Sequence, residues 1–245
     1  MSKVIAFIPA RCGSKSIPMK NIGRLCGKPL IYWNLEALER CAQVDEIVVA
    51  TDCSEIETIV QRFNFQKVSV FRRSEANAQD SSSTESVMLE FIEQIHPDGN
   101  DLFMLVQATS PLTTTEDFQG GLDKFRKSDA DSLLTCVRWK RFFWSPDGQS
   151  LNYDYRQRPR RQDFQGMLME NGAFYISRVK DIIKYKNRLN GRIVIYEMPE
   201  YTGLELDEPH DWHIMEQLMR KYRIREEVRD FSKIKLFATD VDGVL

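Results

Sequence analysis

Short apolar runs alternate with amphipathic stretches over the first 137 residues of the chain. An unbroken run such as KVIAFIP at 3–9 is typical of a buried parallel strand, whereas apolar spacing over 30–41 is typical of a helix. Ser54, with Glu57 three positions on, matches the capping box that opens a helix. The pattern predicts strands at 3–9, 46–50, 67–71, 102–107 and 132–137, and helices at 30–41, from Ser54, at 84–95 and near 115–127. Strand–helix repetition of this kind predicts an α/β fold, with a mostly parallel sheet covered on both faces.

The alternation stops near residue 138. Residues 138–165 are rich in Arg, Trp, Phe, Tyr and Pro without a regular period, which predicts a surface arm or an irregular β excursion. Strands are expected again at 172–177 and 192–198. A helix at about 208–223 follows, opened by Asp207 with Pro209 in its first turn.

Composition narrows the class of protein. The 245 residues are 42% hydrophobic and 29% charged, with a net charge of -2, so neither nucleic acid nor an acidic membrane is an expected partner. We find no signal-type segment and no apolar run long enough to span a membrane, which favours a cytoplasmic location. The five cysteines have no metal-ligand spacing and are expected to be reduced thiols.

The segment after the first strand carries the first candidate chemistry. Residues 10–21 read ARCGSKSIPMKN, in which Arg11, Lys15 and Lys20 supply charge and Gly13 and Ser14 let backbone N–H groups approach an anion. Open α/β sheets bind ligands beyond the carboxyl ends of their strands, so a triphosphate site is expected here. The segment matches neither the P-loop nor the dinucleotide fingerprint, and a solvated basic loop is the alternative.

Glu205 and Asp207 form a second candidate site. Their i, i+2 spacing places both carboxylates on one side of an extended segment, as a shared Mg²⁺ requires. The alternative for Asp207 is a helix N-cap, which is also the expected role of Asp211. A zinc site from these residues with His210 and His213 matches no standard spacing.

Six segments in order resemble the CMP-sialic acid synthetases, or N-acylneuraminate cytidylyltransferases. They are IPARCGSKSIPMKNI, FRRSEANAQDSSST, VQATSPL, RPRRQDF, ENGAFYI and LELDEPHDW, and the resemblance spans residues 3 to about 220. It implies a Rossmann-like three-layer nucleotide-diphospho-sugar transferase fold over residues 1–225, with the aromatic stretch as a dimerisation arm. The related CMP-KDO synthetases lack the GSKxxPxKN pattern.

The resemblance also implies the roles of individual residues. Arg11, Lys20 and Asp207 would be catalytic. CTP would be bound by Arg11, Gly13, Ser14, Lys20, Asn21, Arg73 and Thr84, the sugar by Gln107, Arg161, Asn171 and Gly172, and Mg²⁺ by Asp207 and Glu205. Two positions depart from the family: Met169 replaces an arginine found in some bacterial members, and Glu205 replaces an aspartate.

The implied reaction is transfer of CMP from CTP to a sialic acid, releasing pyrophosphate, in a homodimer. The alternatives are transfer to another acidic sugar, such as deaminoneuraminic (KDN), legionaminic or pseudaminic acid, or a non-catalytic CTP-binding module. No base stands out in the sequence to accept the sugar's proton.

The last stretch, 226–245, differs from what precedes it. A charged linker leads into IKLFATDVDGVL, in which Asp240 and Asp242 resemble the first motif of the haloacid dehalogenase phosphatases. We expect this stretch to be the linker and first strand of a truncated second domain that begins near residue 234. Since the other phosphatase motifs are missing from the chain, no phosphatase activity is expected of it.

Overall fold

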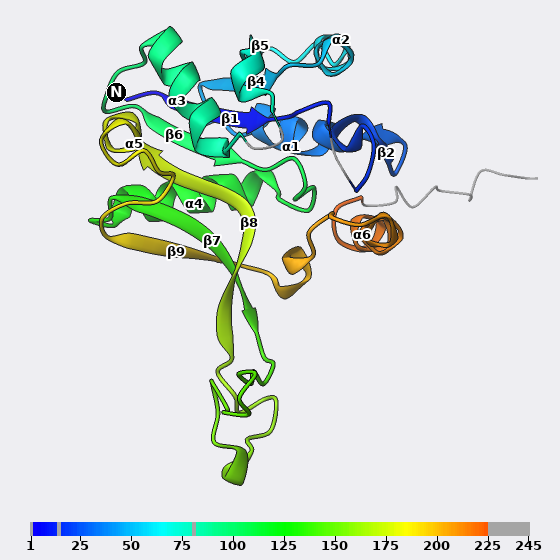
Figure 1. Ribbon diagram of the computed structural model, residues 1–245, viewed down its shortest axis with the longest axis vertical. Helices are drawn as coiled ribbons and strands as arrows, with labels where there is room; N and C mark the ends of the chain where they lie inside the picture. Colours follow the sequence, from blue (N-terminus) through cyan, green and yellow to red (C-terminus); the bar gives the residue numbers. More distant parts are fainter. Residues whose placement is uncertain (1, 14–15, 80–81, 225–245) are drawn as a thin grey trace, which may run out of the picture.

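A seven-stranded sheet forms the centre of the protein, in the order β5-β4-β1-β6-β8-β7-β9 (Figure 1). The computed structural model describes residues 2–13, 16–79 and 82–224. The strands of this sheet are β1 (Val4–Pro9), β4 (Glu46–Thr51), β5 (Val68–Arg72), β6 (Leu102–Val106), β7 (Ser132–Trp139), β8 (Met167–Arg178) and β9 (Ile193–Met198). A separate small hairpin is formed by β2 (Arg24–Leu25) and β3 (Lys28–Pro29).

The direction of the strands decides where the loops gather. β1 pairs in parallel with both β4 and β6, and β4 pairs in parallel with β5. β8 runs the other way, antiparallel to β6 and to β7, while β9 is parallel to β7. The predicted mostly parallel α/β sheet is confirmed. The reversal of β8 brings the beginning of that strand to the edge where the parallel strands end.

Helices cover both faces of the sheet because alternate residues of the buried strands point to opposite sides. From β1, Val4, Ala6 and Ile8 pack with α1, α2 and α4, whereas Ile5 and Phe7 pack with α3 and α5. The helices are α1 (Leu30–Glu39), α2 (Ser54–Arg62), α3 (Thr84–Ile95), α4 (Thr115–Lys127), α5 (Val179–Tyr185) and α6 (Pro209–Tyr222). Short 3-10 turns are η1 (Lys20–Ile22), η2 (Glu75–Asn77), η3 (Tyr155–Gln157) and η4 (Glu200–Gly203). The result is the expected three-layer arrangement.

The last described helix, α6, packs beside the layers. Its Met215 and Met219 share a small buried cluster with Leu25 of β2 and Trp33 of α1. This packing returns the C-terminal part of the domain to the segment that follows β1. It therefore brings residues near 205 next to residues near 20.

Most of the expected elements are confirmed, and α5 was not predicted. Two expected helix caps are wrong. Cys53, not Ser54, is the N-cap of α2, and the Ser54 hydroxyl donates to Glu55 rather than capping. Glu208, not Asp207, is the N-cap of α6, and it forms a capping box with Asp211.

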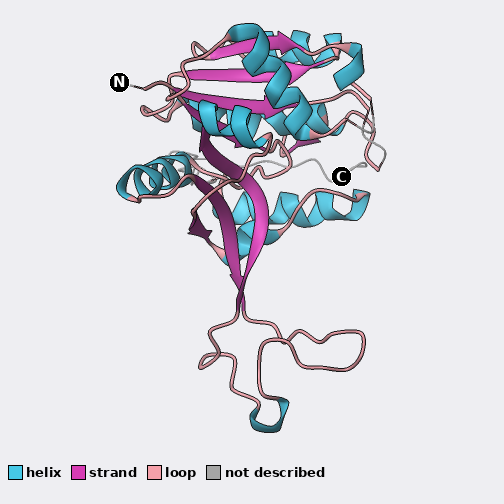
Figure 2. Ribbon diagram, turned by 60° about the vertical axis from the view of Figure 1, so that its left-hand side comes forward, coloured by secondary structure: helices cyan, strands magenta, loops and turns pink. Residues whose placement is uncertain are grey.

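An arm of residues 140–166 extends away from the layers between β7 and β8 (Figure 2). Its interior is aromatic, with Phe142 packed 4.1 Å from Tyr153 and 4.9 Å from Phe164, centroid to centroid. Trp144 and Tyr155 remain about half exposed, at 46% and 54%. The predicted irregular arm is confirmed. β8 starts five residues earlier than predicted because it stays paired with β7 into the arm.

The expectation that all five cysteines are thiols is wrong, because Cys12 and Cys53 form a disulfide. β1 and β4 are neighbours with Pro9 opposite Ala50, so each cysteine lies three residues beyond a paired position. The Cα atoms are 5.3 Å apart, which a disulfide spans readily. Sequence spacing carries no information on this pairing, since strand order creates it.

Two sequence predictions concern residues outside the part of the chain that the structure describes. The linker and phosphatase-like strand at 226–245, with Asp240 and Asp242, lies outside the described residues, and so does Ser14. That part of the chain stays a prediction. Within the described part, none of the helices has the length and apolar character needed to cross a membrane.

Candidate active site

A cavity of about 350 Å³ opens at the edge of the sheet where the parallel strands end. We call it the strand-end cavity. Its lining residues are Pro9, Arg11, Lys20, Asn21, Arg73, Gln79, Ser82, Ser83, Thr84, Val87, Gln107, Ala108 and Thr109. Among them are Arg11, Lys20, Asn21, Arg73, Thr84 and Gln107, which the sequence singled out from three separate segments.

Strand ends explain why these residues meet. Arg73 directly follows β5, Gln107 directly follows β6, and Arg11 comes two residues after β1. Because parallel neighbours end at one edge, side chains far apart in sequence converge there. Three of the converging groups are cationic or proton-donating, so the cavity suits a polyanionic ligand.

The segment between β1 and α1 is held by its own polar groups. The Asn21 amide donates to the Arg11 carbonyl oxygen at 3.1 Å, which closes the loop on itself. Asn21 is buried, so it serves the loop as well as lining the cavity. Gly13 faces open space, since a Cβ built there meets no atom within 4 Å. That position leaves the loop backbone accessible to an anion.

The Arg73 side chain is held in place by an ion pair. Its guanidinium pairs with Asp52, the residue directly after β4, at 2.5 Å, and its side chain is only 5% exposed. The neighbouring Arg72 is exposed to solvent and pairs with Glu57 on α2. Asp52 therefore fixes the direction in which Arg73 enters the cavity.

The beginning of α3 forms another wall. Ser83 is the N-cap and accepts from the Ser86 N–H, and Thr84 is the first helical residue. The unpaired N–H groups and partial positive charge of a helix N-terminus favour a negative ligand there. Thr84 therefore lines the cavity at the positive end of α3.

The start of β8 faces the end of β6. The Gln107 N–H donates to the Ala173 carbonyl at 3.1 Å, which places Gly172 next to Gln107. Gly172 has a φ of 63°, and a Cβ built on it would lie 3.1 Å from Gln107 Oε1 and 3.6 Å from Glu205 Oε1. Gly172 is therefore the point at which the amide and the carboxylate approach each other.

Acidic groups gather beside the strand-end cavity. Burial raises the pKa of the Glu205 carboxyl, the charges of Asp207 and Glu170 raise it further, and Lys20 opposes the shift. Asp207 is 68% exposed at its side chain and lies 3.5 Å from the Lys20 ammonium. Neighbouring carboxylate oxygens are the hard ligands that Mg²⁺ prefers, so Glu205 and Asp207 fit Mg²⁺.

Contacts among the described residues do not support the alternative of a zinc site with His210 and His213. Asp211 accepts from the backbone N–H groups of Asp207 and Glu208, as expected of a helix-cap residue. Over residues 2–13, 16–79 and 82–224, the set of three ligand atoms within 4.8 Å of one another is that of Cys12, Cys53 and Glu55. His210 and His213 belong to no such set.

Two of the predicted sugar-binding residues, Asn171 and Arg161, do not line the strand-end cavity. The Asn171 side chain is fully buried, and its amide donates to Thr202 Oγ1 at 3.2 Å, so it supports η4 instead of facing the cavity. It points away because neighbouring residues of a strand face opposite sides, and Gly172 takes the cavity side. Arg161 lies on the arm, 62% exposed at its side chain, and pairs with Glu200 at 3.3 Å.

The sequence analysis did not identify three residues that support the site. Asn34 on α1 is buried, and its amide donates to the Gln107 carbonyl at 3.1 Å, which supports the turn after β6. Asp52 orients Arg73. Glu170, beside Asn171, accepts from the hydroxyl of buried Tyr175. A polar residue directly after a strand was a usable signal for Asp52, but nothing in the sequence pointed to Asn34.

A doubly covered, mostly parallel sheet with a cationic cavity at its strand ends and carboxylates beside it defines a nucleotide-binding α/β domain. The chain belongs to the cytidylyltransferase family, since the model of that family, described as Cytidylyltransferase, matches residues 5–237. The fold agrees with a solved structure of CMP:2-keto-3-deoxy-manno-octonic acid synthetase complexed with CTP. That structure has a TM-score of 0.66 at 22% identity, covering 90% of this chain and 99% of the other.

Relatives within the family carry two different names. The chain is 37% identical to N-acylneuraminate cytidylyltransferase B of Danio rerio, over 98% of this chain and 56% of that protein. It is 24% identical to pseudaminic acid cytidylyltransferase of Campylobacter jejuni, over 92% of this chain and 98% of that protein. The chain thus spans about half the length of the fish relative.

Proposed function

We propose that this chain transfers CMP from CTP to a sialic acid, giving the CMP-sugar and pyrophosphate. The higher identity to the fish N-acylneuraminate cytidylyltransferase favours this acceptor over pseudaminic acid. Because the chain spans about half of that relative, both the activity and the acceptor are proposals for this protein.

One contact carries the proposal. Lys20 Nζ donates to the Leu206 carbonyl oxygen at 2.6 Å, so the basic loop and the acidic segment meet at a single ammonium group. A nucleotide bound over the loop would have its phosphates next to Glu205 and Asp207. Gly172 lies next to Gln107 and Glu205, and these residues would offer the acceptor a place beside the phosphates.

In the proposed reaction, the anomeric hydroxyl of the sugar attacks the α-phosphorus of CTP. The bond from that phosphorus to the bridging oxygen breaks, and pyrophosphate leaves. Arg11 and Lys20, which line the cavity, would neutralise the charge that grows on the leaving oxygens. Mg²⁺ held by Asp207 and Glu205 would supply further positive charge at the phosphates. Arg73 and the start of α3 would orient the nucleotide, so that catalysis depends mainly on positioning.

We further propose that the protein is a homodimer joined through the arm. Trp144, Tyr155 and Leu151 expose large apolar surfaces far from the layers, which a second copy would bury. Arg161 lies on this arm, so in a dimer it could reach a sugar bound by the other copy. Light scattering of the purified chain tests the dimer, with Trp144→Asp expected to shift the mass towards the monomer. The cytoplasmic location stays a prediction from the sequence.

Pyrophosphate release from CTP and Mg²⁺ tests the main proposal. N-acetylneuraminate, KDN, legionaminic acid and pseudaminic acid are compared with a control that lacks sugar. Fastest release with N-acetylneuraminate or KDN is expected, and fastest release with pseudaminic acid would move the assignment to that acceptor. A protein that binds CTP by calorimetry but releases no pyrophosphate with any sugar would be a nucleotide-binding module.

A further inference from the structure

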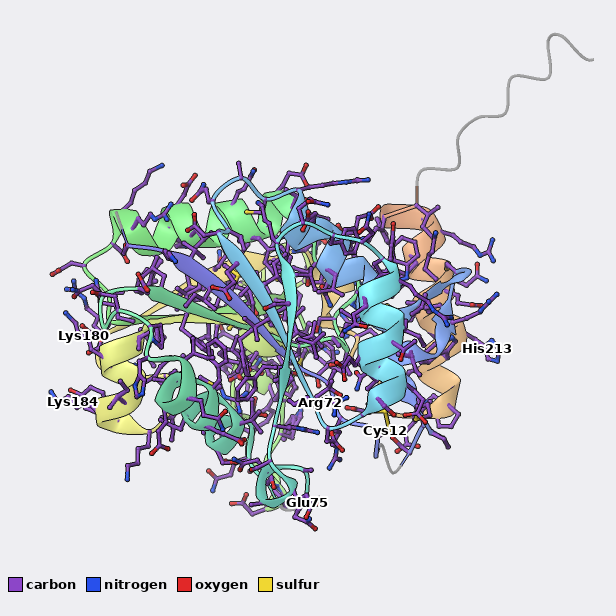
Figure 3. All side chains as sticks on the ribbon, turned by 90° about the horizontal axis from the view of Figure 1, so that it is seen from above. Cys12, Arg72, Glu75, Lys180, Lys184 and His213 are labelled. Carbon is purple, nitrogen blue, oxygen red and sulfur yellow. A yellow bond between two sulfur atoms is a disulfide. The ribbon has the colours of Figure 1, made fainter. Side chains whose placement is uncertain are left out.

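The Cys12–Cys53 disulfide joins two segments that adjoin residues of the strand-end cavity. Cys12 belongs to the loop after β1, Cys53 opens α2, and the two are 41 residues apart in sequence. Figure 3 shows Cys12 in its sulfur–sulfur bond next to α2. The bond therefore attaches the loop that carries Arg11 to the turn after β4.

Each half of the disulfide adjoins a group of the cavity. Cys12 follows Arg11, which lines the cavity. Cys53 follows Asp52, which holds Arg73 at 2.5 Å. On the β4 side, the Cys53 N–H donates to the hydroxyl of buried Thr51 at 3.1 Å, which fixes the backbone at Cys53.

We propose that Cys12 and Cys53 are a reversible redox site whose disulfide organises the basic loop for CTP, so that reduction weakens CTP binding. The inference rests on the proposed use of this cavity for CTP. With the bond in place, Arg11, Lys20, Asn21 and Arg73 line one cavity, so the oxidised form is the one that is ready to bind. In the reduced form the loop keeps the hydrogen bond from the Asn21 amide to the Arg11 carbonyl oxygen, but it loses its covalent attachment to the turn after β4. Reduction therefore gives the loop conformational freedom. The loop must lose this freedom again when CTP binds, which lowers the affinity for CTP.

Low-molecular-weight disulfides such as oxidised glutathione are the oxidants this site would use. The Cys12 thiolate, partly exposed and next to Arg11, attacks one sulfur of the small disulfide and releases one small thiol. The Cys53 thiolate then attacks the Cys12 sulfur of the mixed disulfide and releases the second small thiol. Cys53 suits the second step because it is only 3% exposed, which shields its sulfur from the small disulfide, while the Cys12 sulfur lies within bonding distance. Two protein thiols and one small disulfide thus give one protein disulfide and two small thiols.

The other cysteines provide a contrast. Burial raises the pKa of the Cys26 and Cys41 thiols, and raises that of Cys136 to about 11, so all three stay protonated and react slowly. Cys26 is partly exposed and lies at the β2–β3 turn, outside the cavity. Cys26→Ser is therefore the matched control for Cys12→Ser and Cys53→Ser.

Mass mapping tests the chemistry. Thiols of the full-length chain are alkylated at a series of glutathione ratios, and the protein is then cleaved after Lys and Arg without reduction. The expected product joins residues 12–15 to residues 41–62, with Cys41 alkylated, and it disappears as reduced glutathione increases. Alkylation of both Cys12 and Cys53 under every oxidising ratio would overturn the proposal. So would one tightly held Zn²⁺ per chain with both thiols unbonded, since these sulfurs and Glu55 lie close enough to share a metal.

Calorimetry of CTP binding, without sugar, tests the consequence. Reduction is expected to raise the CTP dissociation constant of the wild type and of Cys26→Ser about three- to tenfold. Cys12→Ser and Cys53→Ser are expected to bind CTP like the reduced wild type under all conditions. An unchanged dissociation constant, with reduction verified by mass, would overturn the role in binding. If affinity follows the redox state but no sugar supports turnover, the proposed transfer reaction fails and this inference stands.

Discussion

Lys20 and Asp207 lie 3.5 Å apart, ammonium nitrogen to carboxylate oxygen, although 187 positions separate them in the chain. The Lys20 side chain is 13% exposed and also donates to the Leu206 carbonyl, so its place is fixed by two partners. The basic loop and the acidic segment therefore form one site. α6 makes this possible, because its packing against β2 and α1 returns the chain to that loop.

Replacing Lys20 should damage both halves of the site. Lys20→Ala removes a cation from the phosphates and leaves the Leu206 carbonyl without its donor. We expect pyrophosphate release to fall by about 100- to 1,000-fold, the usual effect of losing one charge-stabilising donor. Steady-state assays with CTP and N-acetylneuraminate measure this loss. Lys127→Ala, an exposed residue at the end of α4, is the control and should keep wild-type rates.

Metal removal should stop the proposed reaction. With EDTA in excess we expect no pyrophosphate release, and recovery when Mg²⁺ is added back, because Asp207 and Glu205 present hard oxygen ligands. Asp207→Asn should raise the Mg²⁺ concentration needed for half-maximal rate by about tenfold or more. Full activity of Asp207→Asn at the wild-type Mg²⁺ requirement would remove this residue from the metal site. Asp123→Asn on the exposed face of α4 is the control.

Gly172→Ala should impair the acceptor side of the site. The φ of 63° strains any residue with a Cβ, and this Cβ would press on Gln107 Oε1 at 3.1 Å. We expect a loss of about 1–3 kcal/mol in unfolding free energy and a raised KM for the sugar, with less change in the KM for CTP. Gly27→Ala separates the two causes, because Gly27 has a φ of 81° but nothing within 4 Å of its Cβ. An equal change in sugar KM for both variants would argue against contact with Gln107.

Stability should depend on pH through Glu205. Burial, Asp207 and Glu170 raise the pKa of its carboxyl, so the folded state holds this proton more tightly than the unfolded state. Its contribution to stability is present at low pH and is lost as pH rises through the folded pKa. Glu205→Gln lacks this loss, and should therefore gain stability relative to wild type as pH rises from about 4 to 7. Urea unfolding at each pH provides the comparison.

Asp211→Asn should show the opposite trend. Hydrogen bonding from the Glu208 N–H lowers the pKa of Asp211, so its contribution is present near neutral pH and is lost as pH falls. The deficit of this variant relative to wild type should therefore shrink in acid. Parallel pH trends for Glu205→Gln and Asp211→Asn would contradict the assigned environments.

The sequence by itself determined the local elements. Unbroken apolar runs such as 102–106 and periodic ones such as 84–95 carry their own structural signal, so β6 and α3 were predicted within a residue. It also singled out Arg11 and Lys20 as basic residues of the segment that follows the first strand, whereas Arg73 and Gln107 were identified through the resemblance to the CMP-sialic acid synthetases.

Only the tertiary structure decided which of these residues meet and which way they point. The reversal of β8 puts Gly172, and not Asn171, beside Gln107, and a shift of one residue exchanges the two faces of a strand. The neighbouring ends of β1 and β4 bring Cys12 to Cys53, and the packing of α6 brings Asp207 to Lys20. These contacts depend on strand order and long-range packing, for which the physical information is spread over the whole chain instead of lying near either partner.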